Sequence, residues 1–182
     1  MMLSWLRDKV KTLQNKNLLL IGLTISFIAL AFQMIGFLFP FWMSSNDGPY
    51  SVTAGLWQVC GMDGESECLD IQVAGPGLPG WFMAVQALTV LAVIFFILAV
   101  ICAGAKLLLF KNKILFLFVA TGAVFLGAVS VFFAVIVFAA RRNELFFGKA
   151  YTLHFAYGFT IFGMLAAATA GLFFVLELRK IK

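Results

Sequence analysis

Charged residues are scarce in this chain: Asp, Glu, Lys and Arg make up 12% of its 182 residues, whereas 63% are hydrophobic. A water-soluble domain of this length would lack the polar surface needed to cover itself. Histidine occurs once and cysteine three times, so few side chains are the imidazoles and thiols that most often bind zinc. The composition excludes an ordinary soluble domain and indicates a membrane protein that is not an enzyme.

Four stretches meet the length of about 20 apolar residues that a spanning helix requires. They are residues 18–40, 81–109, 114–140 and 153–178. The first stretch follows basic residues, as a signal peptide does, but it exceeds the length of a signal core and no small-residue cleavage site follows it. We therefore expect an all-α membrane protein, one four-span domain whose helices form a single antiparallel bundle.

Lys and Arg are distributed unequally along the chain, because ten of the 13 lie in or beside residues 1–17, 110–113 and 179–182. Cytoplasmic segments retain the excess of basic residues, so we expect both termini in the cytoplasm and a plasma-membrane protein. Residues 41–80 and 141–152 are then the extracellular segments. The basic residues form no patch outside these flanks, so anionic lipid head groups are the expected contact and nucleic acid is not.

Two of the three cysteines, Cys60 and Cys68, lie in the first extracellular segment, whereas Cys102 lies alone within the second span. We predict a Cys60–Cys68 disulfide, which contributes about 2–3 kcal/mol in the loop-closure model. A metal site is the alternative, although no His or third Cys lies nearby in the sequence. We expect Cys102 to be a packed apolar residue, with palmitoylation as its alternative.

The first extracellular segment is acidic and contains no Lys or Arg. Four of its acids are candidates for an electrostatic contact surface: Asp63, Glu65, Glu67 and Asp70. In a barrier between cells, such a cluster would favour cations over anions. The alternative, which the residues alone favour, is a solvated turn that keeps the segment soluble.

Small residues at four-residue spacing occur in the fourth span at Gly163, Ala167 and Gly171. Such spacing lets helices approach closely in lipid. We expect these residues to pack helices of one chain together, with a dimerisation face as the alternative.

A spaced motif runs through the first extracellular segment: Trp42, then Gly55, Leu56 and Trp57, then Cys60 and Cys68. A Trp followed by GLWxxC and a second Cys, between the first two of four spans, resembles the signature of the superfamily of claudins, peripheral myelin protein 22 and epithelial membrane proteins. The resemblance covers the whole chain. It implies a left-handed four-helix bundle with a small extracellular antiparallel β-sheet, made mostly by the first outer segment, in which the disulfide joins two strands and Trp42 and Trp57 are structural. Residues 50–53, 56–60 and 68–73 have acceptable strand composition, with a turn at Asp63 and Gly64.

Two features depart from the claudin pattern. Claudins usually carry an Arg at the outer mouth of the second span, whereas this chain has Gln86. Claudins that bind junction scaffolds end in a Tyr-Val type tail, whereas residues 178–182 of this chain read Leu-Arg-Lys-Ile-Lys. Gln86 resembles the branch of myelin and epithelial membrane proteins, and both features argue against scaffold-anchored tight-junction strands.

The function we expect is cell–cell contact, junction formation or membrane organisation through the first extracellular segment. The alternative is an auxiliary subunit that binds an ion channel or receptor in the membrane, and myelin-like adhesion alone is a third, weaker option. The expected partners are the lipid bilayer and other membrane proteins, with no cofactor, metal or small-molecule substrate. His154 is expected to be a packing or interface residue, because no nucleophile stands at a recognisable spacing from it.

Overall fold

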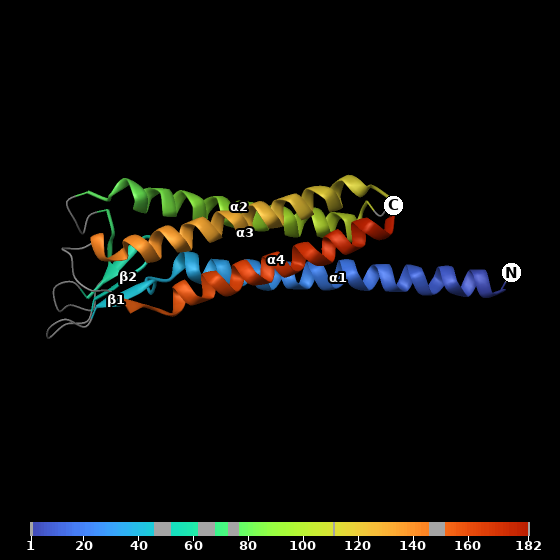
Figure 1. Cartoon of the computed structure of the whole chain (residues 1–182), viewed down its shortest axis with the longest axis horizontal. Helices are drawn as coiled ribbons and strands as arrows, with labels where there is room; N and C mark the ends of the chain where they lie inside the picture. Colours follow the sequence, from blue (N-terminus) through green and yellow to red (C-terminus); the bar gives the residue numbers. More distant parts are fainter. Residues whose placement is uncertain are drawn as a thin grey trace.

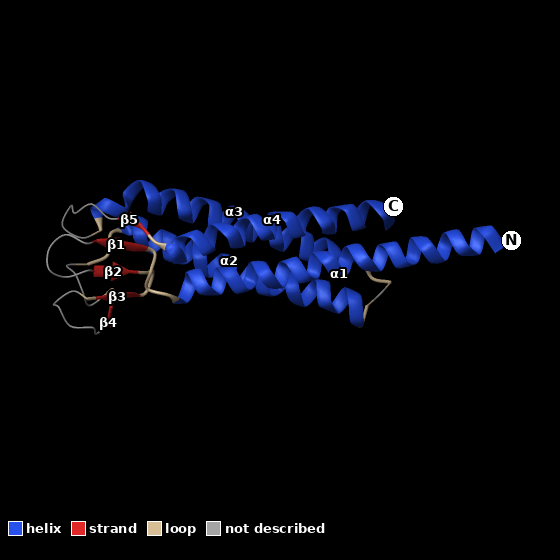
Figure 2. Cartoon of the chain, turned by 90° about the horizontal axis from the view of Figure 1, so that it is seen from below, coloured by secondary structure: helices blue, strands red, loops and turns tan. Residues whose placement is uncertain are grey.

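The computed structural model describes residues 2–45, 52–61, 68–72, 77–110, 112–145 and 152–181, with side chains from residue 18 to residue 180. Four long helices lie side by side, and a small sheet caps one end of them (Figures 1 and 2). The helices are α1 (Met2–Leu38), α2 (Gly80–Leu108), α3 (Ile114–Arg141) and α4 (Phe155–Ile181), and a 3-10 turn, η1 (Arg142–Glu144), follows α3.

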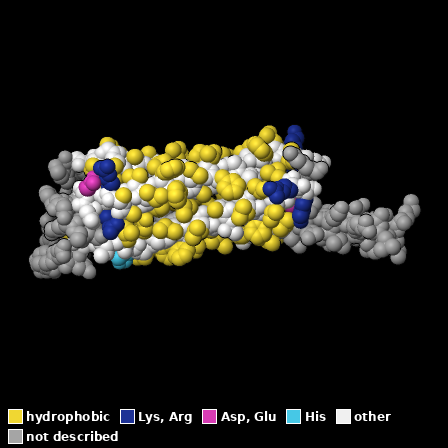
Figure 3. Space-filling view, viewed as in Figure 1, with side chains coloured by type: hydrophobic (Ala, Val, Ile, Leu, Met, Phe, Trp, Pro, Cys, Tyr) yellow, Lys and Arg dark blue, Asp and Glu magenta, His cyan; other side chains and the backbone are white. Residues whose placement is uncertain are grey.

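Each helix contains a segment long and apolar enough to cross a membrane: Leu18–Leu38, Gly80–Leu108, Ile114–Glu144 and Phe155–Lys180. Apolar side chains form a broad band along the bundle, and Lys and Arg lie toward its two ends (Figure 3). The predicted four-span bundle is confirmed. Helix α1 begins at Met2, well before the predicted span, because no Gly or Pro interrupts residues 2–21.

The sheet has five antiparallel strands in the order β4-β3-β2-β1-β5. They are β1 (Met43–Ser45), β2 (Val52–Ala54), β3 (Gln58–Cys60), β4 (Cys68–Asp70) and β5 (Thr152–Leu153). Four strands come from the segment between α1 and α2, and β5 comes from the segment between α3 and α4. The small antiparallel sheet that the resemblance implied is therefore present. The segments with strand composition overlap β2 and contain β3 and β4, whereas β1 and β5 were not predicted because such short strands show no alternation.

Glycine and phenylalanine pack the helices together. Gly22 of α1 faces the ring of Phe174 in α4, Gly127 of α3 faces Phe96 in α2, and Gly171 of α4 faces Phe125 in α3. A methyl group at any of these glycines would overlap the ring that lies against it. The missing side chain thus makes the space that each ring fills, which brings the helix backbones close.

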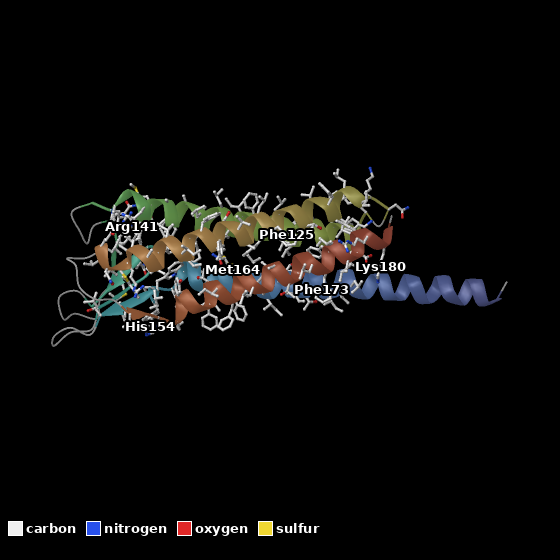
Figure 4. The ribbon with its side chains drawn as sticks, in the orientation of Figure 1. Phe125, Arg141, His154, Met164, Phe173 and Lys180 are labelled. Atoms are coloured by element: carbon white, nitrogen blue, oxygen red, sulfur yellow. A yellow bond between two sulfur atoms is a disulfide. The ribbon has the colours of Figure 1, made fainter. Side chains whose placement is uncertain are left out.

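The stripe of small residues on α4 contacts helices of the same chain. A methyl group on Gly163 would lie 3.2 Å from the carbonyl oxygen of Ala29 in α1, Ala167 is fully buried, and Gly171 lies against Phe125, which Figure 4 labels. These contacts bring α4 against both α1 and α3.

Two buried glutamines differ in their hydrogen bonding. Gln33 of α1 is fully buried, and neither its amide nitrogen nor its amide oxygen has a partner among the residues that the structure describes. Gln86 of α2 is 7% exposed, and its amide nitrogen donates a hydrogen bond of 2.6 Å to the carbonyl oxygen of Leu56. A buried amide without a partner lowers stability, whereas a paired one at this place ties the sheet to the bundle.

Replacement of these glutamines by methionine, which has a similar shape, is therefore expected to act in opposite directions. Gln33→Met should raise the free energy of unfolding by about 1–3 kcal/mol, and Gln86→Met should lower it by a similar amount. Thermal unfolding of both purified variants in one detergent measures the difference. A lower midpoint for Gln33→Met would show that its amide has a partner and contradict this description.

Candidate interaction surface

Trp42 joins the sheet to the helices. Its side chain is fully buried, its indole N–H donates to the carbonyl oxygen of Gly36, and its ring lies edge-on to Phe138 at 4.8 Å and to Tyr157 at 5.7 Å between centroids. Its backbone N–H donates to the carbonyl of Ala54, and its own carbonyl accepts from the N–H of His154, both at 2.9 Å. One residue thereby connects α1, the sheet and the segment that leads into α4.

Gly55 lies where the sheet approaches the end of α1. A methyl group at this position would be 2.6 Å from the Cα atom of Pro40 and 2.7 Å from the carbonyl oxygen of Phe39. Both neighbours are backbone atoms, which cannot rotate away as a side chain can. The motif therefore requires glycine here for close approach of two backbones.

The next two motif residues, Leu56 and Trp57, lie in the turn between β2 and β3 and fix it to the helices. Leu56 is 1% exposed and its carbonyl accepts the hydrogen bond from Gln86. Trp57 lies edge-on to Phe37 of α1, with ring centroids 5.2 Å apart, and its carbonyl accepts from the N–H of Ile71 at 2.9 Å. The turn thus contacts α1, α2 and the segment that follows β4.

The predicted disulfide between Cys60 and Cys68 is present, and these two residues lie opposite each other in the β3–β4 pairing. Because the two sulfurs are bonded to each other, neither is a thiolate ligand, and the metal alternative at this pair does not apply. Cys102 is buried in α2.

The sheet exposes side chains at both of its edges. All three residues of β4 are exposed, including Leu69 at 43% and Asp70, whose carboxylate accepts the N–H of Gln72 at 2.9 Å. Both residues of β5 are exposed at the opposite edge. The other predicted acids, Asp63, Glu65 and Glu67, lie outside the described residues.

Among the described residues near the sheet are one imidazole and one ion pair. The side chain of His154, labelled in Figure 4, is exposed, and its ring lies 5.7 Å from Phe41 and 5.1 Å from Phe155. Arg141 forms an exposed ion pair of 3.3 Å with Glu144. Within the described ranges no three His, Cys, Asp or Glu residues lie close enough together to hold a metal ion.

Fold and surface together define a four-span membrane protein that bears a disulfide-linked sheet at one end. The sequence profile of the PMP-22/EMP/MP20/Claudin family matches residues 16–176. The chain belongs to this family, as its Trp and GLWxxC residues indicated. A comparison with curated proteins, taken one at a time, returned no match.

Alanine at Gly55 is expected to disrupt the contact between the sheet and α1, because the new methyl group overlaps backbone atoms. We expect Gly55→Ala to lower the free energy of unfolding by about 1–3 kcal/mol, the usual cost of overpacking. Gly80→Ala is the matched control, since nothing lies within 4 Å of a methyl group there. Thermal unfolding of both variants makes the comparison. Equal midpoints would show that the close contact between Gly55 and the backbone of Phe39 and Pro40 does not affect stability.

Proposed function

We propose that this protein organises cell–cell contacts at the plasma membrane, with the sheet outside the cell and both termini in the cytoplasm. The unequal distribution of Lys and Arg supports this orientation. The disulfide supports it as well, because disulfides persist in oxidising compartments.

The observation that carries the proposal is the form of the sheet. It is fixed to the bundle by Trp42 and Gly55, its strands β3 and β4 are held by the disulfide, and its β4 edge is exposed. A rigid platform with an exposed edge is suited to binding another protein, because little conformational freedom is lost on association. Asp70 on this edge supports an acidic contact surface that includes Asp63, Glu65 and Glu67, and in a barrier between cells such a surface would favour cations.

An auxiliary role within the membrane is the second candidate. Aromatic residues of α1 and α4 lie against one another on the outside of the bundle, with Phe32 at 5.5 Å from Phe159 and 6.4 Å from Phe162, which is 60% exposed. Phe32 and Phe159 are half-buried, and a large exposed aromatic side chain such as Phe162 supplies contact area for the spans of a channel or receptor.

Mixed culture of expressing and non-expressing cells tests the proposal. We expect the protein to be enriched at borders between two expressing cells and not at borders with non-expressing cells. Neutralisation of the acids by Asp63→Asn, Glu65→Gln, Glu67→Gln and Asp70→Asn should reduce the enrichment if they form the contact surface, whereas Glu144→Gln, outside the cluster, should not.

Uniform distribution over the cell surface would contradict the contact role. Purification from native membranes in mild detergent is the companion measurement, in which recovery of a channel or receptor in fixed stoichiometry would support the auxiliary role instead. If surface labelling finds the segment with Trp57 and Cys60 inside the cell, both roles are wrong.

A further inference from the structure

An apolar groove lies at the end of the bundle opposite the sheet, between the start of α3 and the end of α4. Its volume is about 370 Å³, and it is lined by Ile114, Leu115, Phe118, Val175, Leu178 and Arg179. Five of these residues are apolar, and the sixth carries a permanent positive charge at the end of α4. Figure 4 shows this region around the label of Lys180.

Positive charge is concentrated at the mouth of the groove. Arg179 and Lys180 are exposed in the last turn of α4, and the exposed Lys113 directly precedes Ile114. No side chain caps the first turn of α3, so its backbone N–H groups and the positive end of its helix dipole add to this potential. Glu177, the acidic residue of this part of α4, is buried rather than exposed at the mouth.

An apolar groove with positive charge at its mouth matches a molecule that has an apolar chain and an anionic group. An acyl chain fits an apolar groove, and a head group with a net negative charge pairs with Arg and Lys at its mouth. The volume lies within the range of about 300–1,000 Å³ that is usual for ligand sites. A second copy of the chain would have to place an anionic residue here, yet the described exposed acids, Asp70 and Glu144, lie on β4 and in the turn after α3, at the sheet end.

We propose that the groove binds one anionic phospholipid, with an acyl chain along Leu115 and Phe118 and the net negative head group at Arg179, the charged residue among those that line the groove. The orientation proposed above places the groove in the cytoplasmic leaflet, where anionic phospholipids are concentrated. The lipid site itself depends only on the groove and its charges, so it can be tested independently of any role at cell contacts.

Native mass spectrometry of the purified full-length protein tests the site, with dioleoylphosphatidylserine and dioleoylphosphatidylcholine added at equal concentration. We expect one retained lipid and a preference for the serine lipid of about fivefold for one cationic contact. Arg179→Gln should bring the two lipids close to equal retention. Leu115→Trp should fill the groove and remove the retained lipid of either kind, and Arg141→Gln, an exposed arginine at the sheet end, is the matched control that should behave as wild type.

Equal retention of the two lipids by the wild-type protein would overturn the proposal, as would an unchanged preference in Arg179→Gln. Displacement of the lipid by glycerophosphoserine, which has the head group but no acyl chains, would show an anion site without a role for the groove. A dimer of the wild-type protein that Leu115→Trp dissociates would identify a second copy as the occupant and also overturn it. Because Arg179 is exposed, Arg179→Gln keeps the test decisive even if Leu115→Trp does not fold.

Discussion

The burial of Trp42 is the interaction on which the rest of the structure depends. Its indole N–H, its ring and its backbone bind α1, the aromatic residues Phe138 and Tyr157, and strand β2. Tyr157 in turn packs against both the core of the bundle and the core beneath the sheet, and its hydroxyl donates to the carbonyl of Val135 at 3.1 Å. The sheet is thus an extension of the helical core.

The sequence was sufficient to predict the features that depend on local composition or on the motif. Apolar length predicted the four spans, and the placement of the cysteines predicted the disulfide. The sheet was implied by the family resemblance that Trp42, the GLW run and the two cysteines carry. Strands β1 and β5 could not be predicted, because Ser44 pairs with Thr152 across more than a hundred residues and neither segment alternates. The reason for glycine at position 55 also lies in a distant contact, with the backbone of Phe39 and Pro40. Similarly, the sequence placed Gln86 at the mouth of α2, but only the fold brings it to the carbonyl of Leu56.

The two ends of the bundle differ in chemistry, and this difference connects the proposed roles. The sheet end presents an exposed strand with an acidic residue and the exposed Arg141–Glu144 ion pair, whereas the opposite end presents Arg179 and Lys180 beside an apolar groove. Between them the outer surface of the helices carries many exposed large apolar side chains, as a lipid-facing surface does. The proposed contact role uses this arrangement, in which the bundle would hold the sheet at a fixed height and orientation on the membrane.

Hydrogen–deuterium exchange of the full-length protein in lipid nanodiscs tests most directly whether Trp42 holds the sheet to the bundle. In Trp42→Ala we expect the amides of β1, β2 and β3 to lose protection while those of α2 and α3 keep theirs. The control is Phe162→Ala, which removes an aromatic ring that is 60% exposed and should leave the sheet protected. Unchanged protection of the sheet in Trp42→Ala would contradict the account.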